Sequence, residues 1–232
     1  MRLRAAHNQA FVGDASSFHR LVADWGHKQV RPSEATVAGS EPRHRLDLLA
    51  LVLCCAQVTL ASSNSYSYGR KEMRFDEYLA SINHGDNRIG ARRANETYYL
   101  FGDLDNREFA QLIDAYHVPS HAPAKATGGH EYQLSFGVGG HLSGVMFHFH
   151  GPGFIEVVHG QKVWFIYRDG RMPQFDANMT SAEWYTHVYP TLLPDDRPDR
   201  CTIGPGEVLY FPSKWYHATL NYGFTVFMTT FL

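Results

Sequence analysis

Cysteine is scarce in this chain. Its 232 residues include three, Cys54, Cys55 and Cys201, and no two of them form a Cys-x-x-Cys pair. Small domains that depend on disulfides, and zinc sites built from thiolates, need several regularly spaced cysteines. The scarcity argues against both kinds of protein, although it does not fix the redox compartment.

Net charge is also small, at −2 with histidine neutral. A protein that binds nucleic acid or an anionic membrane usually presents a strong positive field, which this balance does not provide. We therefore expect no nucleic-acid partner.

Long apolar runs are missing as well. The main candidate lies in "RHRLDLLALVLCCAQVTLASS", where Asp47 interrupts a short apolar stretch. A membrane-spanning helix needs about 20 apolar residues, so we expect no span, and a buried helix leading into a strand is the simpler interpretation. An internal translation start or a gene-model error is the alternative, because the first thirty residues lack the continuous apolar core of a secretory signal.

The chain does contain many apolar and aromatic side chains, 44% and 14% of its residues, which is enough to bury a sizeable core. Residues 1–45 are polar and mixed, and we predict a partly disordered N-terminal extension there. Residues 46–232 are predicted to form one domain with a barrel core at about 130–232, since short β-rich runs alternate with glycine and proline in that core. The predicted strands include "IEVVHG" and "KVWFIYRDG" as one separate pair and "HATLNYG" and "TVFMTTFL" as another, and helices are predicted at "FDEYLASI" and "TSAEWYTHVY". The predicted fold class is mainly β, a sandwich or barrel with flanking α-helices.

Histidine is abundant, with 14 copies, and two of them, His148 and His150, lie two residues apart in "FHFHGPGFIEVVHG". On a strand they face the same side. Imidazole binds iron, zinc, copper and nickel, but such a site needs a further ligand from elsewhere in the fold. His217 in "GEVLYFPSKWYHATLN" is the natural donor, and Glu156 is a candidate carboxylate. A lone histidine is more often structural or solvated, so the prediction of a metal site depends on the whole set.

Several separated strings resemble, in order, the JmjC family of the cupin superfamily. They are "NSYSYGRKEM", "NETYYLFGD", "FHFHGPGFIEVVHGQKVWFIY", "CTIGPGEVLYFPSKWYHATLN" and "TVFMTTFL". The resemblance implies a double-stranded β-helix, which is a jelly-roll barrel. For active members it also implies Fe(II), 2-oxoglutarate and dioxygen, used to hydroxylate or demethylate protein side chains, with His148 as the first iron ligand and His217 as the last. Active members carry Asp or Glu where this chain has His150, so the identity of the metal stays open.

The resemblance also implies co-substrate contacts. Lys162 matches a lysine that pairs with the distal carboxylate of 2-oxoglutarate, and Thr229 and Asn221 match polar positions near the pocket. A lysine aimed into a barrel needs such an anion, but strand alternation alone does not exclude that Lys162 faces solvent. Val145 weighs against turnover, because active members often have a hydroxyl or aromatic group at that position.

Three functions stay open. The leading interpretation is a regulatory or interaction protein that keeps a three-histidine metal pocket without oxygenase turnover and acts through protein partners, which His150 and Val145 favour. An active Fe(II)/2-oxoglutarate-dependent dioxygenase that hydroxylates a protein substrate is the first alternative, which Lys162 favours. A general cupin metalloenzyme, with Glu156 joining the histidines, is the second. The sequence assigns no catalytic residue and no oligomeric state.

Two glycosylation sequons begin at Asn95 and Asn178, and they matter only in a secretory compartment. The JmjC protein that the strings match most closely belongs to the endoplasmic reticulum lumen, so the resemblance implies that location. The cytoplasm is the alternative, because no N-terminal signal is visible.

Overall fold

The structure is a computed structural model that describes residues 2–4, 56–84, 93–103, 116, 132–168 and 170–232. Most of the predicted N-terminal extension at 1–45, and residues 46–55 of the predicted domain, therefore lie outside the described residues. Arg2–Arg4 is the exception and forms a short strand.

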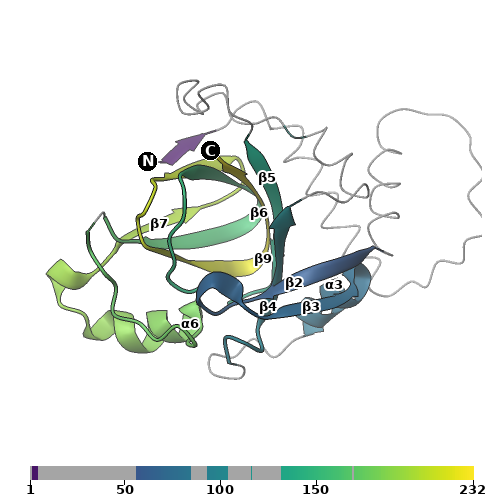
Figure 1. Cartoon of the computed structure of the whole chain (residues 1–232), viewed down its shortest axis with the longest axis horizontal. Helices are drawn as coiled ribbons and strands as arrows, with labels where there is room; N and C mark the ends of the chain where they lie inside the picture. Colours follow the sequence, from purple (N-terminus) through teal and green to yellow (C-terminus); the bar gives the residue numbers. More distant parts are fainter. Residues whose placement is uncertain (1, 5–55, 85–92, 104–115, 117–131, 169) are drawn as a thin grey trace, which may run out of the picture.

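The described strands form one antiparallel sheet that curls around a central space (Figure 1). In chain order they are β1 (Arg2–Arg4), β2 (Gln57–Ser62), β3 (Arg70–Arg74), β4 (Tyr98–Asp103), β5 (Gln133–Gly139), β6 (Gly153–Ile166), β7 (Asp199–Ile203), β8 (Glu207–Phe211) and β9 (His217–Phe231). The spatial order is β1-β8-β6-β9-β5-β4-β2-β3, and β7 also pairs with β6. The predicted fold class, a mainly β jelly roll with flanking helices, is confirmed.

Two long strands, β6 and β9, make the walls of the barrel and pair along most of their length. The sequence predicted each as two strands separated by a glycine turn, and that prediction is wrong. Gly160 and Gly223 lie inside the strands with positive φ values of 77° and 80°. Glycine adopts this conformation without a Cβ clash, so each strand bends at the glycine and continues instead of ending.

The segment that carries the first two histidines was also predicted to be a strand, and it is not one. It forms a single bridge in which the main-chain amides of His148 and His217 donate to each other's carbonyl oxygens, at 3.1 and 2.9 Å. This bridge is enough to bring the first predicted ligand beside the last.

Short helices lie on the outside of the barrel. They are η2 (Ser65–Ser67), α3 (Phe75–His84), α6 (Ser181–Glu183), η4 (Trp184–Val188), η5 (Tyr189–Thr191) and η6 (Pro194–Asp196). The predicted helices at "FDEYLASI" and "TSAEWYTHVY" are confirmed. A reciprocal capping box between Thr180 and Glu183 begins α6, and the Trp184 ring then packs edge-on against Phe147 with centroids 4.7 Å apart.

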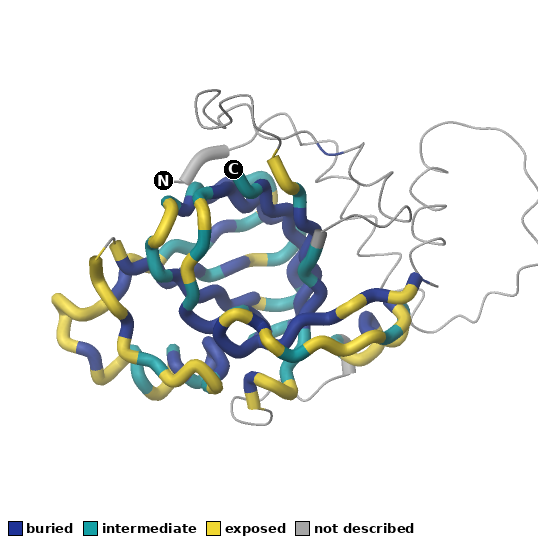
Figure 2. Tube along the Cα trace, viewed as in Figure 1, coloured by how far each residue is buried: buried dark blue, intermediate teal, exposed yellow. Residues whose placement is uncertain are grey.

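Buried residues line most of the barrel wall, while exposed residues gather on the helical segments and loops (Figure 2). No helix in the described part of the chain is long and apolar enough to cross a bilayer.

Candidate metal centre

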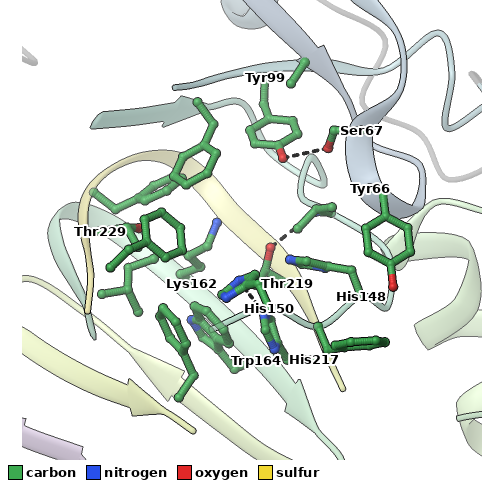
Figure 3. A pocket seen from close by; sticks show the side chains of 18 of the residues that line it. Tyr66, Ser67, Tyr99, His148, His150, Lys162, Trp164, His217, Thr219 and Thr229 are labelled. Carbon is green, nitrogen blue, oxygen red and sulfur yellow. Dashed lines mark hydrogen bonds between the residues drawn. The ribbon is translucent and has the colours of Figure 1, made fainter. Parts of the chain in front are cut away.

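Three histidines meet at one end of the barrel (Figure 3). One ring nitrogen from each of His148, His150 and His217 lies within 4.8 Å of the others. His217 begins β9, and the other two come from the bridged segment that precedes β6. His150 stays in the cluster and does not turn away from it, and its ring packs edge-on against those of Phe211 and Phe231, with centroids 5.0 and 5.1 Å away.

Each imidazole is oriented by its Nδ1 atom. That atom lies at hydrogen-bond distance from a main-chain carbonyl oxygen, which is Met146 O for His148 (2.9 Å), Gly151 O for His150 (2.8 Å) and Trp215 O for His217 (2.9 Å). A carbonyl oxygen only accepts, so each Nδ1 carries the proton and each Nε2 keeps a lone pair. Ligand histidines in metal sites are held in this way.

The Nε2 atoms of His150 and His217 are 3.1 Å apart. Because both carry lone pairs, they repel each other unless a cation lies beside them. Two imidazole nitrogens bound to one metal ion, each at 2.0–2.1 Å, are separated by about 2.9–3.4 Å. The donor set therefore fits a divalent transition metal, and neutral imidazoles suit iron, zinc, copper and nickel.

The three rings are held neutral by their surroundings. Burial, and then the neighbouring His150, lowers the pKa of His148 to about 4. Burial also lowers the pKa of His150, and burial together with the other two imidazoles holds that of His217 well below its usual value. The lone pairs are thus free for a metal ion at neutral pH.

The histidines line a cavity of about 260 Å³. The cavity reaches the surface beside Tyr66 and Phe149, which are 47% and 39% exposed. Drug-sized ligands usually occupy pockets of about 300–1,000 Å³. This cavity therefore suits ligands smaller than a drug-sized molecule.

Lys162 points into the same cavity and is 2% exposed. A β-bulge in β6 causes this orientation, because the register to β9 shifts twice between Val157 and Gln161. Ile155 faces the cavity before the bulge, and Lys162 and Trp164 face it afterwards. A bulge re-aims the side chains that follow it, which is why alternation read from the sequence did not settle the direction of Lys162.

The amine of Lys162 has little to neutralise it. Its Nζ donates to Asn221 Oδ1 at 2.9 Å and lies 3.9 Å from the centroid of the Phe227 ring. It makes no ion pair with any described residue, and burial lowers its pKa to about 7. Asn221 is itself fixed by donating to Ser143 Oγ at 3.0 Å.

The remaining predicted site residues fall in different places. Thr229 is buried and lines the cavity, as does Val145. Asn221 lies behind Lys162 and orients it. Glu156 is buried, but it is not one of the described cavity-lining residues, and its carboxylate accepts a hydrogen bond from the Tyr116 hydroxyl at 3.0 Å.

Sequence reasoning missed several lining residues. Tyr66 has a φ of 61°, which is unusual for a non-glycine residue, and its ring lies edge-on to His148 with centroids 6.3 Å apart. Arg70, Tyr99 and Trp164 also line the cavity. The string "NSYSYGRKEM", with its tyrosines and a charge, was the available signal for Tyr66 and Arg70.

No protein-family model matches the chain. Among curated proteins, JmjC domain-containing protein 8 of rat is 42% identical over 175 residues, and that of human is 42% identical over 180. Each match covers 75% of this chain. This chain belongs to the JmjC family.

The resemblance inferred from the sequence strings is thus confirmed. The chain spans 63–64% of the length of the rat and human relatives. The lysine-specific demethylase JMJ21 of Arabidopsis thaliana is 26% identical over 189 residues, covering 68% of this chain and 18% of its own length. A solved cupin superfamily protein from Desulfitobacterium hafniense is 12% identical, and the match covers 65% of this chain and 85% of that protein with a TM-score of 0.31. Family membership and the histidine cluster together make this a JmjC-fold protein with a metal-binding site.

Proposed function

We propose that this chain binds a divalent metal ion through His148, His150 and His217, and a 2-oxo dicarboxylate such as 2-oxoglutarate through Lys162. We further propose that it uses this pair, with Fe(II) as the metal, to oxidise a protein side chain. The observation that carries the proposal is the direction of Lys162. Its buried amine shares a cavity with three imidazole lone pairs and has no anionic partner among the described residues.

Charge supports a dianionic ligand. Three neutral imidazoles would leave a divalent ion with both of its positive charges, and Lys162 adds up to one more. Burying uncompensated charge is costly, and no aspartate or glutamate lines the described cavity. A dicarboxylate would neutralise the metal and the amine together. The absence of the usual carboxylate at position 150 makes this need greater.

Each group would have a distinct task. The imidazoles would hold the metal, and their Nδ1 hydrogen bonds would keep Nε2 directed at it. Asn221 would keep the Lys162 amine in place for the distal carboxylate, and Phe211, Phe227 and Phe231 would exclude water. When bound, Fe(II) and 2-oxoglutarate supply oxidation by dioxygen, in which one oxygen atom enters the substrate while succinate and carbon dioxide are released.

A regulatory or interaction role without turnover is the second candidate. His150 favours it. A neutral imidazole in place of a carboxylate gives the metal site one negative charge fewer, which alters oxygen activation. Val145, which lines the cavity without a polar group, favours it as well. In this case the same metal and dicarboxylate would control binding to a protein partner. Glu156 does not approach the histidines, so the general cupin metalloenzyme that included it gains no support.

The test combines metal content with turnover. Protein purified without oxygen would be analysed by mass spectrometry for iron and zinc, loaded with Fe(II), and assayed for 2-oxoglutarate binding and succinate release. The test variant is Lys162→Met, and the exposed Lys71→Met is the matched control. Succinate release that Lys162→Met abolishes and Lys71→Met preserves would support the oxygenase. Binding of metal and 2-oxoglutarate without succinate would support the second candidate, and no metal binding would contradict both.

We also propose that the protein works in the endoplasmic reticulum lumen. Asn95 and Asn178 are both exposed, as acceptor asparagines must be. A mobility shift after endoglycosidase treatment of protein from cells, lost in Asn95→Gln/Asn178→Gln, would support this location. Unglycosylated protein in the cytosolic fraction would contradict it.

A further inference from the structure

The cavity has a second basic group, at a separate part of its lining, that the metal and the 2-oxo dicarboxylate do not account for. We propose that Arg70 receives the substrate, and that the side chain admitted to the pocket is acidic, an aspartate or glutamate of a protein segment. This inference rests on the proposed function and adds the class of substrate to it.

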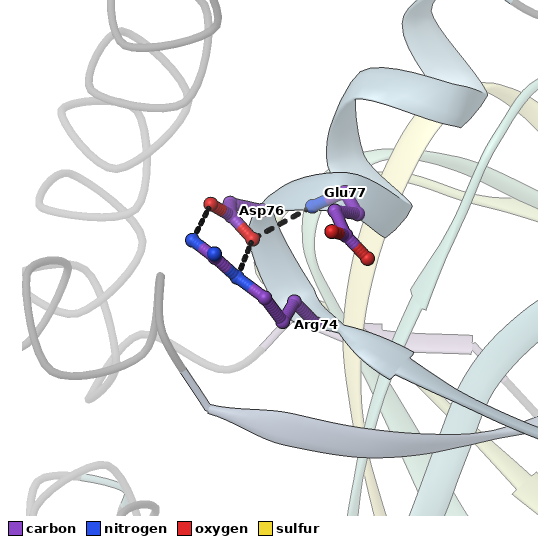
Figure 4. Close-up of polar contacts among 3 residues, drawn as sticks. All are labelled: Arg74, Asp76 and Glu77. Atoms are coloured by element: carbon purple, nitrogen blue, oxygen red, sulfur yellow. Dashed lines mark hydrogen bonds and ion pairs between the residues drawn. The ribbon is translucent and has the colours of Figure 1, made fainter. Parts of the chain in front are cut away.

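Arg70 carries a positive charge that no described residue neutralises. Its guanidinium donates to the main-chain carbonyl oxygens of Ser67 and Gly69, the latter at 3.1 Å. Carbonyl contacts orient the group but leave its charge in place. Arg74 on the same strand is different, because its guanidinium pairs with Asp76 at 3.0 and 2.5 Å (Figure 4). Glu72 lies between the two arginines in sequence and forms no ion pair with Arg70.

Hydroxyl groups beside Arg70 can complete an anion site. Ser67 Oγ and the Tyr99 hydroxyl oxygen are 3.0 Å apart, and both residues are buried and line the cavity. Burial raises the pKa of Tyr99, so its hydroxyl keeps a proton that it can donate. In Figure 3 this pair lies across the cavity from His217.

Trp164 is a further sign that a ligand with acceptor atoms occupies the cavity, at the histidine end, where its ring lies 5.3 Å from that of His217. It is 3% exposed and lines the cavity, and its Nε1–H has no hydrogen-bond partner among the described residues. Indole nitrogen only donates, and buried donors in folded proteins are almost always satisfied. The group is therefore expected to meet an acceptor oxygen of a bound molecule.

The polar lining as a whole selects by charge. It consists of donor-only groups such as Arg70, Lys162 and Trp164, hydroxyls such as those of Ser67 and Tyr99, and the metal-facing histidines. A dicarboxylate would neutralise the metal and Lys162 and leave Arg70 unpaired. A lysine or arginine side chain would meet the charge of Arg70 and no aspartate or glutamate of the described lining, whereas a carboxylate would pair with the guanidinium. The exposed rings of Tyr66 and Phe149 at the mouth can contact the rest of the segment.

The test uses binding, so it does not depend on turnover. Protein loaded with Zn(II), which does not activate dioxygen, would be saturated with 2-oxoglutarate. It would then be titrated by calorimetry or NMR with blocked Gly-Ala-X-Ala-Gly peptides in which X is Asp, Glu, Asn or Lys. We expect the Asp or Glu peptide to bind about tenfold or more tightly than the Lys peptide, and Asn to fall between them.

Variants assign the effect to Arg70. Arg70→Met should reduce the Asp or Glu peptide to the affinity of the Asn peptide, and Arg70→Lys should keep part of the preference. Lys71→Met, which removes a neighbouring positive charge outside the cavity, should change nothing. Equal binding of the Asp, Glu and Lys peptides, absence of any peptide binding, or a preference that survives in Arg70→Met would overturn the inference. Metal and 2-oxoglutarate binding, measured in the same samples, would show separately whether the proposed function stands.

Discussion

Removing the amine of Lys162 should stabilise the ligand-free protein. Burial lowers the pKa of this group from 10.5 to about 7. Each unit of difference between folded and unfolded pKa values corresponds to about 1.4 kcal/mol, so the protonated amine costs the folded state at most about 5 kcal/mol. Lys162→Met removes this cost but also removes the hydrogen bond to Asn221, worth about 1–2 kcal/mol. We expect a net gain of about 3 kcal/mol at pH 7, or about 6–12 °C in Tm.

The pH dependence gives the sharper signature. Between pH 7 and 10.5 the unfolded chain binds the lysine proton and the folded chain does not, so stability of the wild type rises with pH by up to about 1.4 kcal/mol per unit. Below pH 7 the amine is protonated in both states and the full cost is present. Lys162→Met lacks this slope, so its advantage should shrink as the pH rises.

The assay is urea unfolding of metal-free protein at pH 6.5, 7.5, 8.5 and 9.0. Lys71→Met should keep the wild-type slope, since this lysine is exposed. Metal and 2-oxoglutarate should flatten the wild-type slope, because a bound carboxylate holds the proton on Lys162. Parallel wild-type and Lys162→Met curves, or a less stable variant at pH 7, would refute the idea of a buried amine waiting for an anion.

The remaining predictions concern the metal and the cavity wall. His217→Ala should lower metal content from about one ion per chain to about a tenth or less, whereas the exposed His187→Ala should not; unchanged metal content would remove the assigned triad. His150→Asp should bind Fe(II) about tenfold more tightly, equal to about 1.4 kcal/mol, but weaken 2-oxoglutarate, and calorimetry that shows both affinities rising would contradict the charge argument. Gly137→Ala should cost about 1–3 kcal/mol, because the new Cβ would lie 2.1 Å from the Phe227 ring, and an unchanged urea midpoint would show that the ring yields.

The sequence predicted the parts of the site that depend on residue type and spacing. The separation of His148 and His150, and the string around His217, were enough to name the three histidines that the fold brings together. Short β-rich runs between glycine and proline also predicted many of the strands correctly. Each of these features is local, so neighbouring residues contain the information.

The missed features depend on contacts between distant segments. Lys162 faces the cavity because β6 is bulged against β9, and a bulge depends on both strands. Read from the sequence alone, Gly160 indicated a turn. In the structure β6 pairs with β9 both before and after this glycine, so the chain bends there and stays within one strand. Trp164 gave no sign of its role, and the charge in "NSYSYGRKEM" did not show that Arg70 lines the cavity. A charge without a partner and a donor without an acceptor become visible only when the neighbours are in place.

His150 links these features into one electrostatic argument. In active JmjC proteins a carboxylate at this position neutralises part of the metal charge before any co-substrate binds. Here three neutral imidazoles, Lys162 and Arg70 leave that charge to be balanced by whatever enters the cavity. Metal and dicarboxylate should therefore strengthen each other's binding by the same factor, as linkage requires. Under the proposed function, such a protein would respond to the concentration of its small-molecule anion whether or not turnover follows, so the oxygenase and regulatory interpretations would share a ligand-dependent state.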